Sequence, residues 1–292
     1  FFRKDFGNYA KISHMGEVSE PYPIPDYIDL PSYAITGLPT PGPTEPEIKT
    51  EEQIEGMRDA CKLARTILTM VGENIKVGMT TDDIDFLVHT SVVERGAYPS
   101  PLNYQGFPKS VCTSVNNVAC HGIPDDRPLD DGDLISVDVT VYYKGFHGDC
   151  CETFLVGNVD SAGVHLFNAA RKCRDEAIKI CKSGVYFSDI GNMIMSVARG
   201  ENVTVVPAFI GHGIGSYFHG PPDIYHNLNH YPGKMKPGMT FTIEPIVAQG
   251  GEEAIILEDG WTAVMLDDGR AAQFEHTILI TDDGHEILTD YF

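Results

Sequence analysis

Four carboxylates stand in stretches of this sequence that otherwise have the composition of β-strands. They are Asp138 and Asp149 within ISVDVTVYYKGFHGDCCETF (135–154), Glu244 within FTIEPIV (241–247) and Glu275 within AQFEHTILI (272–280). One such acid is usually a residue on the solvent face of its strand, but four of them are harder to explain because Asp and Glu have low strand propensity. An ionised carboxylate also costs several kcal/mol to bury unless a partner compensates its charge. The recurrence predicts that these acids gather around a cation.

Two histidines accompany the acids in the glycine-rich stretch GHGIGSYFHG (211–220). A single histidine is more often structural, but glycines let the backbone pass close to a site, and His212 completes a set of one nitrogen and four carboxylates. A thiolate-free set of this kind suits Mn, Fe(II), Co or Zn. Because four carboxylates would overcharge one ion, the set predicts two divalent ions about 3.5–4 Å apart, as in hydrolases that polarise a carbonyl group and generate hydroxide.

The helices that must support these residues are predicted by apolar periodicity. Thr50 and Gln53 form a capping box ahead of apolar residues spaced alternately by three and four, which is typical of an amphipathic helix. A second helix is expected from near Thr80 to just before Gly96. Two later helices are expected over about 161–182 and 187–199.

The strands are predicted by alternation. In residues 134–143 the polar side chains, Asp138 among them, share one face because strand side chains alternate with a period of two. Further strands are expected at 110–115, 154–156, 204–206, 240–247, 254–257, 262–266 and 272–280. The order of helices, strands, helices and strands predicts an α+β domain of two halves, with helices covering one face of a largely antiparallel sheet.

Composition limits the classes of partner. The formal net charge is −21, with 21 Lys and Arg against 42 Asp and Glu, which argues against nucleic acid because phosphate binding depends on clustered basic side chains. A negative field instead attracts metal ions and substrates with a free amine. No apolar run is long enough to span a membrane.

Seven cysteines are spread along the chain without a CxxC pair, which favours a reducing compartment over secretion. The adjacent Cys150 and Cys151 admit a redox interpretation. The preferred interpretation is that both are small residues of a strand, because a free Cys mostly behaves as a small hydrophobe.

The N-terminal region differs from the rest of the chain. It begins with Phe rather than Met, which indicates a processed or shortened start, and eight prolines stand between positions 21 and 46. Proline is excluded from helix interiors and central strands. We therefore expect residues 1–46 to form an extended arm and residues 47–292 to form the catalytic domain. The side chains expected to pin the arm to the domain are Tyr22, Tyr27, Ile28 and Tyr33.

The motifs DVTVYYKGFHGD, GHGIGSYFHG, FTIEP and QFEHT, together with CHGIPDDRPL (120–129), resemble the methionine aminopeptidases. The resemblance covers roughly residues 50–290. It implies the pita-bread (creatinase/aminopeptidase-like) fold, which has two pseudo-symmetric halves of antiparallel sheet with helices on the outer face. It also implies a dinuclear enzyme that removes the initiator methionine from nascent or newly made proteins and peptides, by attack of a metal-bridging hydroxide on the first peptide bond.

The resemblance assigns roles to the ligand candidates. Asp138 would chelate one ion and His212 the other, whereas Asp149 and Glu275 would bridge the two. Glu244 would bind metal and shuttle protons between the nucleophilic water and the leaving amine.

The resemblance also implies which residues hold the substrate. His219 would donate a hydrogen bond to the scissile carbonyl oxygen as negative charge develops, and His121 would position the substrate near its scissile amide. Residues expected to form the methionine pocket are Tyr104, Phe107, Cys112, Phe218 and Trp261. Aromatic walls and a soft sulfur suit a flexible thioether, although each aromatic taken alone could equally belong to the core.

The short interval between His212 and Glu244 leaves no room for the helical insertion of the family's second type, so the chain resembles type I. The stretch SPLNYQGFPKSVCTSVNNVACHGIP (100–124) is most similar to the mitochondrial form. A mitochondrial location is therefore expected, with a cytoplasmic location as the alternative, and we expect a monomer.

Three other functions remain open at this stage. A proline-specific peptidase of the same fold would be expected to carry an additional N-terminal domain, and a non-catalytic binding scaffold would be expected to lack metal ligands. A mononuclear oxygenase would need two histidines and one acid around a single iron, whereas this sequence offers the reverse proportion.

Overall fold

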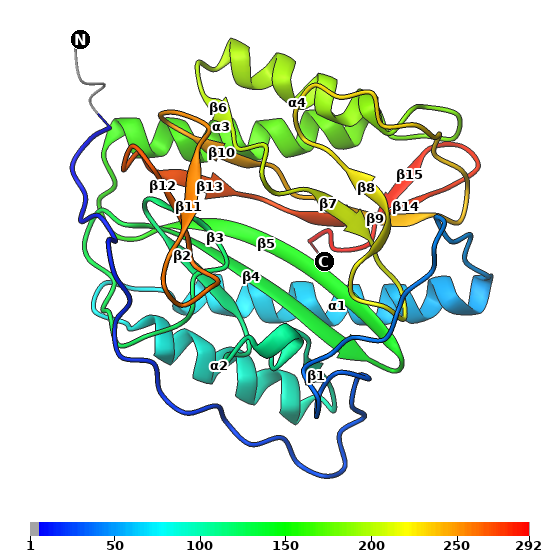
Figure 1. Ribbon diagram of the computed structural model, residues 1–292, viewed down its shortest axis with the longest axis horizontal. Coiled ribbons are helices and arrows are strands. Elements are labelled where there is room, and N and C mark those ends of the chain that lie inside the picture. The colour runs from blue at the N-terminus through cyan, green and yellow to red at the C-terminus, as the bar shows by residue number, and fades with distance from the viewer. Residues whose placement is uncertain (1–5, 292) are drawn as a thin grey trace.

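The computed structural model of the chain describes residues 6–291, in which two pairs of helices enclose short antiparallel sheets (Figure 1). The helices are α1 (Glu51–Asn74), α2 (Thr81–Glu94), α3 (Ser161–Lys179) and α4 (Ser188–Gly200), with a short 3-10 helix, η1 (Tyr104–Gly106). The first pair lies on one side of the sheets and the second pair on the other (Figure 1). No helix in the described residues is both long and apolar enough to cross a membrane.

The N-terminal half is built on one sheet. Its strands are β1 (Tyr98–Pro99), β2 (Cys112–Val115), β4 (Leu134–Tyr143) and β5 (Phe146–Leu155), in the order β1-β4-β2 with β5 paired to β4. All these pairings are antiparallel. The β4–β5 hairpin is the longest ladder, because ten consecutive residues of one strand pair with ten of the other.

The C-terminal half contains a five-stranded sheet of order β15-β14-β9-β7-β8 and a three-stranded sheet of order β13-β10-β6. A second three-stranded sheet, of order β11-β12-β3, joins β3 of the N-terminal half to two strands of the C-terminal half. The five-stranded sheet consists of β7 (Gly211–Gly213), β8 (Gly220–Ile224), β9 (Thr240–Ile243), β14 (His276–Ile280) and β15 (His285–Ile287). The other strands are β3 (Val118–Cys120), β6 (Thr204–Val205), β10 (Ile246–Ala248), β11 (Ala254–Ile256), β12 (Ala263–Met265) and β13 (Ala271–Gln273). Each half therefore combines a helix pair with antiparallel strands, which confirms the predicted α+β architecture.

The local signals for the first helices are confirmed. The Thr50 hydroxyl accepts a hydrogen bond from Gln53 N at 3.3 Å, and Gln53 Oε1 accepts one from Thr50 N at 2.8 Å, so the capping box opens α1. Thr80 and Asp83 form the same reciprocal pair at the start of α2. Both caps satisfy backbone N–H groups that a helix leaves unpaired at its start.

The strand expected through residues 154–156 is β5, which extends back to Phe146, so the strand surroundings predicted for Asp149, Cys150 and Cys151 are confirmed. Glycine at position 148 lets α1 lie directly against β5, since a Cβ there would fall 2.4 Å from Ala60 C. Cys150 and Cys151 are fully buried within β5, as small strand residues are expected to be. Burial raises the pKa of the Cys150 thiol to about 12, which keeps it protonated and unreactive.

Two acids predicted to lie inside strands lie instead at breaks between strands. Glu244 follows β9 and precedes β10, and Glu275 follows β13 and precedes β14. At both points the chain leaves one sheet and enters another, since β9 and β14 pair with each other whereas β10 and β13 pair with each other. Strand propensity does not restrict a residue at such a crossing, because it has no ladder position to fill.

Each helix pair covers its own apolar cluster. Residues of α1 and α2 pack with Ile135, Val137 and Val139 of β4 in one cluster. Residues of α3 and α4 pack with Phe241 and Ile278 in the other. The polar face of β4 points away from its helices, towards the C-terminal half.

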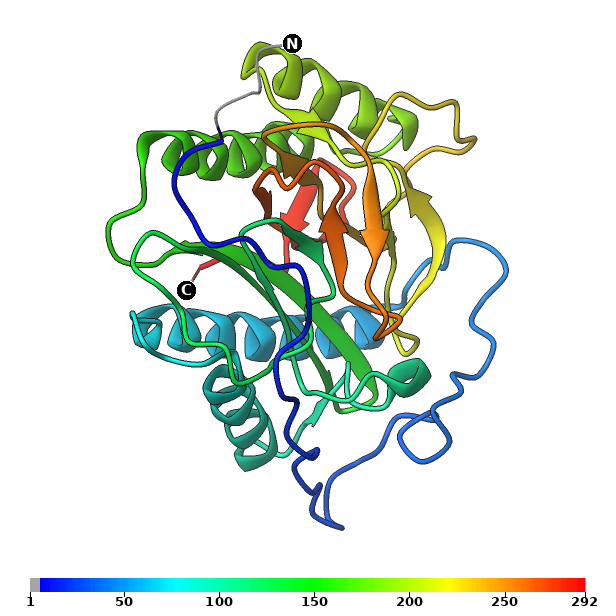
Figure 2. The ribbon, with the colours of Figure 1, turned by 60° about the vertical axis from the view of Figure 1, so that its left-hand side comes forward.

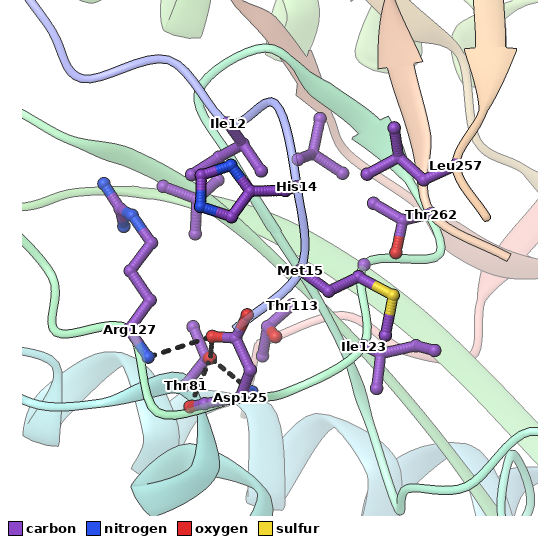
Figure 3. Close-up of a pocket in the computed structure, with 13 residues that line it drawn as sticks. Ile12, His14, Met15, Thr81, Thr113, Ile123, Asp125, Arg127, Leu257 and Thr262 are labelled. Carbon is purple, nitrogen blue, oxygen red and sulfur yellow. Dashed lines mark hydrogen bonds between the residues drawn. The ribbon is translucent and has the colours of Figure 1, made fainter. Parts of the chain in front are cut away.

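The arm, residues 6–46, contains no helix or strand and runs along the domain surface (Figures 1 and 2). Ile28 and Tyr33 are buried, and Tyr22 packs on Phe86, so the pinning roles predicted for these three are confirmed. The same prediction for Tyr27 is wrong, because its side chain is 74% exposed. Nearer the N-terminus, residues 12–15 close a small cavity of about 30 Å³ against the domain (Figure 3).

Candidate metal centre and active site

One cavity of about 420 Å³ between the two halves is lined by every residue predicted from the sequence to take part in chemistry or substrate binding. These residues are Asp138, Asp149, His212, Glu244, Glu275, His121, His219, Tyr104, Phe107, Cys112, Phe218 and Trp261. Residues more than 170 positions apart in the chain therefore meet at one site. The fold brings all twelve together.

The β4–β5 hairpin positions the two aspartates. Thr140 pairs with Asp149, and Asp138 pairs with Cys151, so both acids project from the same face of the hairpin two residues out of register. The Thr140 hydroxyl donates to Asp149 Oδ1 at 2.6 Å and fixes the direction of that carboxylate. The second Asp149 oxygen lies 3.8 Å from His212 Nε2.

His212 presents a single nitrogen to the acids. Its Nδ1 donates to the carbonyl oxygen of Gly213 at 3.2 Å, which leaves a lone pair on Nε2. Nε2 lies 3.5 Å from Glu244 Oε1. Burial lowers the pKa of His212 to about 4, so the imidazole is neutral at neutral pH, as a metal ligand must be.

Glu244 is held by hydrogen bonds from side chains and not by backbone pairing between strands. The Thr242 hydroxyl donates to Glu244 Oε1 at 2.7 Å, and Gln273 Nε2 donates to the Glu244 carbonyl oxygen at 3.1 Å and to Oε2 at 3.4 Å. The Glu244 backbone N–H donates to His226 Nε2 at 3.2 Å. These contacts fix both the main chain and the carboxylate at the crossing.

The acid cluster is uncompensated by the protein. Within residues 6–291, Asp138 Oδ1 and Glu275 Oε1 are buried without a hydrogen-bond partner. Single ligand atoms of Asp149, His212 and Glu275 all lie within 4.8 Å of one another. Buried oxygens without partners are costly, so this donor set fits divalent cations.

Ionisation equilibria at the site lead to the same conclusion. Burial raises the pKa of Asp138 to about 6 and that of Glu244 to about 8. Burial, followed by the charge of neighbouring carboxylates, raises the pKa values of Asp149 and Glu275 well above their ordinary range. A divalent cation bound beside these carboxyl groups would lower their pKa values and stabilise their ionised forms.

The predicted pocket side chains form the wall of the cavity beside the acids. Phe107 and Trp261 meet edge to face at 5.2 Å, and Tyr104 and Phe218 do so at 4.9 Å. Cys112 is buried and pairs with Asp138 across β2 and β4. The result is an apolar recess directly beside the carboxylates, which suits a substrate with an apolar side chain and a polar backbone.

The two remaining histidines come from different halves. The His121 ring lies 6.1 Å from the Trp261 ring and 5.4 Å from that of Phe209. His219 is exposed on the cavity wall, and its Nδ1 is hydrogen-bonded to the Tyr104 hydroxyl at 2.9 Å. Both rings can therefore reach a molecule that occupies the cavity.

Several residues at the site were missed from the sequence. Thr140, Thr242, His226 and Gln273 hold the carboxylates and their backbone. Thr140 could have been found, because it shares the polar face of its strand with Asp138. The others carry no local signal, since their partners are set by the packing of separate segments.

Comparisons with known proteins agree with this site. The model of metallopeptidase family M24 matches residues 55–282. The human protein named "Methionine aminopeptidase 1D, mitochondrial" is 54% identical over 97% of this chain and 86% of its own length. Its mouse counterpart is 56% identical with the same coverage.

Solved structures give the same assignment. The methionine aminopeptidase of Rickettsia prowazekii is 40% identical and superposes with a TM-score of 0.82, covering 84% of this chain and 100% of that chain. A prolidase from Pyrococcus furiosus, at 21% identity and a TM-score of 0.66 over 84% of this chain and 66% of its own, shares the fold alone. The architecture is the pita-bread fold, and the chain belongs to metallopeptidase family M24 and, within it, to the methionine aminopeptidases.

Proposed function

We propose that this methionine aminopeptidase removes the initiator methionine from newly made proteins and peptides with a two-metal centre held by Asp138, Asp149, His212, Glu244 and Glu275. The observation that carries the proposal is the cluster of uncompensated buried carboxylates beside an apolar recess. Two divalent ions bound there would polarise the scissile carbonyl and supply a nucleophilic water near neutral pH.

The protein's own side chains carry the other steps. Glu244 accepts a proton from the attacking water and returns it to the leaving amine. Cations bound beside it would favour its ionised form, which offsets the effect of burial. His219 donates a hydrogen bond to the scissile carbonyl oxygen, where negative charge develops in the transition state. His121 holds the substrate near the same amide.

The recess selects the side chain. Tyr104, Phe107, Cys112, Phe218 and Trp261 receive the methionine thioether, because aromatic rings and a thiol make favourable contacts with sulfur. The acid cluster draws the free amino terminus to the open end of the centre. An N-terminal methionine therefore satisfies both parts of the cavity.

Domain organisation and location complete the proposal. We assign residues 1–46 to the arm and residues 47–292 to the catalytic domain, of which the structure describes 6–291. The enzyme acts in the mitochondrion, as the names of the human and mouse relatives suggest. Fluorescence imaging of the tagged full-length protein tests the location, and a cytoplasmic signal would contradict it.

The function is tested by peptide cleavage. Metal-free protein is reloaded with Mn, Co, Fe(II) or Zn and given Met-Ala-Ser, with matched peptides that begin with Leu or Pro. Selective release of methionine supports the proposal. Cleavage of proline peptides instead would indicate the proline-specific alternative, and no turnover with any ion would indicate a binding scaffold.

A further inference from the structure

We propose that the N-terminal arm is part of the active site, because its segment 33–37 clamps the turn that carries Tyr104 and thereby keeps the Tyr104 hydroxyl on His219. The inference rests on the proposed role of His219 in methionine removal. The arm otherwise resembles a surface wrapping, since it forms neither helix nor strand over residues 6–46 (Figure 2).

The turn that carries Tyr104 has an unfavourable backbone. Asn103 has a φ of 59° and Gln105 a φ of 50°, so a left-handed residue stands on each side of Tyr104. Asn tolerates this region, whereas Gln rarely adopts it. Residues in this region are strained and persist where the surroundings hold them. Backbone hydrogen bonds within the turn hold it in part: Phe107 N donates to Tyr104 O at 3.0 Å, Asn103 N to Phe107 O at 2.7 Å, Tyr104 N to Pro101 O at 2.9 Å and Gly106 N to Asn103 O at 3.3 Å. Contacts from outside the turn add to this support.

The arm supplies that support on both sides of Tyr104. Asn103 Nδ2 donates to the Ala34 carbonyl oxygen at 3.0 Å, and Gln105 N donates to the Gly37 carbonyl oxygen at 2.8 Å. Gly37 has a φ of +75°, and a Cβ there would meet the Asn103 carbonyl oxygen at 3.4 Å. Residues 34–37 of the arm and residues 103–105 of the turn are therefore in close, hydrogen-bonded contact, which we call the clamp.

Tyr33 links the clamp to the aromatic wall. Its ring is 3% exposed and meets the Tyr104 ring edge to face at 4.9 Å. Its hydroxyl donates to the Ser100 carbonyl oxygen at 2.7 Å, and the Ser100 hydroxyl is hydrogen-bonded to His147 Nδ1 at 2.8 Å. His147 in turn stacks on Phe218 at 5.2 Å. One arm side chain therefore supports both Tyr104 and the residue that precedes His219.

The Tyr104 hydroxyl sets the direction and tautomer of His219. When that hydroxyl donates to Nδ1, the ring proton lies on Nε2, which can then donate to the scissile carbonyl oxygen. If the turn moved, the His219 imidazole would remain in the cavity but would no longer point at the scissile carbonyl oxygen. Small misplacements of this kind lower kcat more than they weaken substrate binding. Tyr33 is accordingly a positioning residue.

A double-mutant cycle on the full chain, loaded with Mn, tests the inference with Met-Ala-Ser as substrate. Tyr33→Ala and Tyr104→Phe are each expected to lower kcat about tenfold, the effect of losing one oriented hydrogen bond. The double variant should be no slower than Tyr104→Phe within about twofold, because the direct effect of both changes is on the Tyr104–His219 bond and the route from Tyr33 through Ser100 and His147 to Phe218 is indirect. Metal content and inhibition by free methionine should stay unchanged. Multiplied losses in the double variant would overturn the clamp.

Two further variants keep the test decisive. Tyr22→Ala removes an arm contact to Phe86 and His89 on α2, so it serves as the matched control and should leave kcat unchanged. Asn103→Gly removes the bond to Ala34 without backbone strain, and it should lower kcat about fivefold even if Tyr33→Ala does not fold. Equal losses in Tyr22→Ala and Tyr33→Ala would overturn the inference.

The outcomes also separate this inference from the function on which it rests. If the unaltered protein does not release methionine, the proposed function fails and the clamp fails with it. If the unaltered protein releases methionine, and Tyr33→Ala and Asn103→Gly both have the same kcat as that protein, the proposed function stands and only the clamp hypothesis is wrong.

Discussion

The two halves of the domain present their acids to the site in different ways. Asp138 and Asp149 project from the middle of two ten-residue strands in continuous register. Glu244 and Glu275 lie at crossings where the chain passes from one sheet to another. Backbone pairing between strands fixes the position of an acid without any bond to its side chain. An acid between two strands depends instead on hydrogen bonds from neighbouring side chains.

The carboxylates of the two halves are therefore fixed in position by different interactions. The hairpin provides two carboxylates whose spacing is set before any metal arrives. At the crossings, Thr242 and Gln273 hold the Glu244 carboxylate, whereas Glu275 Oε1 has no hydrogen-bond partner within residues 6–291. Burial makes both positions unfavourable for charge. We therefore expect the N-terminal half to be preorganised and the C-terminal half to depend more on bound cations.

The strongest test replaces one bridging candidate from each half. Asp149→Asn and Glu275→Gln should each lower kcat/KM at least about a thousandfold and weaken metal uptake, because an amide cannot neutralise two cations. Circular dichroism should show an unchanged fold, and metal analysis measures the uptake. Full turnover by either variant would contradict the bridging role. Loss in one variant alone would show that the halves do not contribute equally.

The two cavity histidines allow a second comparison between the halves. His219→Ala should lower kcat by about 10²–10³, the usual effect of removing a donor to a developing oxyanion, with little change in metal content. His121→Asn is the counterpart from the other half, chosen because His121 has a φ of 54° and Asn tolerates that region. A loss of metal in proportion to activity would make His219 a ligand instead.

Protonation gives a third test, in which the metal-free protein should lose stability as pH rises above 7. Unfolded carboxyl groups titrate near pH 4, whereas burial raises the pKa of Glu244 to about 8. Between these values the folded carboxyl group keeps its proton, so its contribution to the free energy of unfolding falls with increasing pH. Burial lowers the pKa values of His121 and His212 to about 4, which acts in the opposite direction until unfolded imidazoles have lost their protons near pH 7. The melting temperature in chelator should therefore drop by about 2–3 °C from pH 7 to 8.5.

Saturating Mn provides the control for that measurement. Metal displaces the protons, so its stabilising effect should grow with pH. Glu244→Gln should flatten the decline above pH 7, because it removes the carboxyl group with a pKa of about 8. A metal-free melting temperature that is independent of pH would contradict the raised pKa values at the centre.

Much of this architecture could be predicted because its signals are local. Capping boxes at Thr50 and Thr80 and the alternation of 134–143 are short-range patterns, and each appears where it was expected. The ligand candidates were recognisable because charge in apolar surroundings is costly wherever it occurs. The helix starts and the metal-ligand candidates could therefore be predicted from the sequence alone.

The remainder depends on pairing between distant segments. The full length of β5 is set by its ten-residue pairing with β4. The crossings at Glu244 and Glu275 arise because β9 pairs with β14 while β10 pairs with β13. The supports of the acids and the clamp around Tyr104 are likewise contacts between segments that no local pattern connects.

The smallest expected effect compares the two threonines that donate to acids at the site. Thr140→Val removes the bond to Asp149. Thr242→Val removes the bond to Glu244 and also the bond that the Thr242 hydroxyl accepts from His212 N at 3.0 Å. Both changes keep side-chain shape. The ladder still holds Asp149, so Thr140→Val should lower kcat only about threefold, whereas Thr242→Val frees a carboxylate at a crossing and should cost about tenfold or more. Steady-state kinetics at saturating metal measures both. Equal losses would show that side-chain hydrogen bonds, and not backbone pairing, set the positions of the acids in both halves.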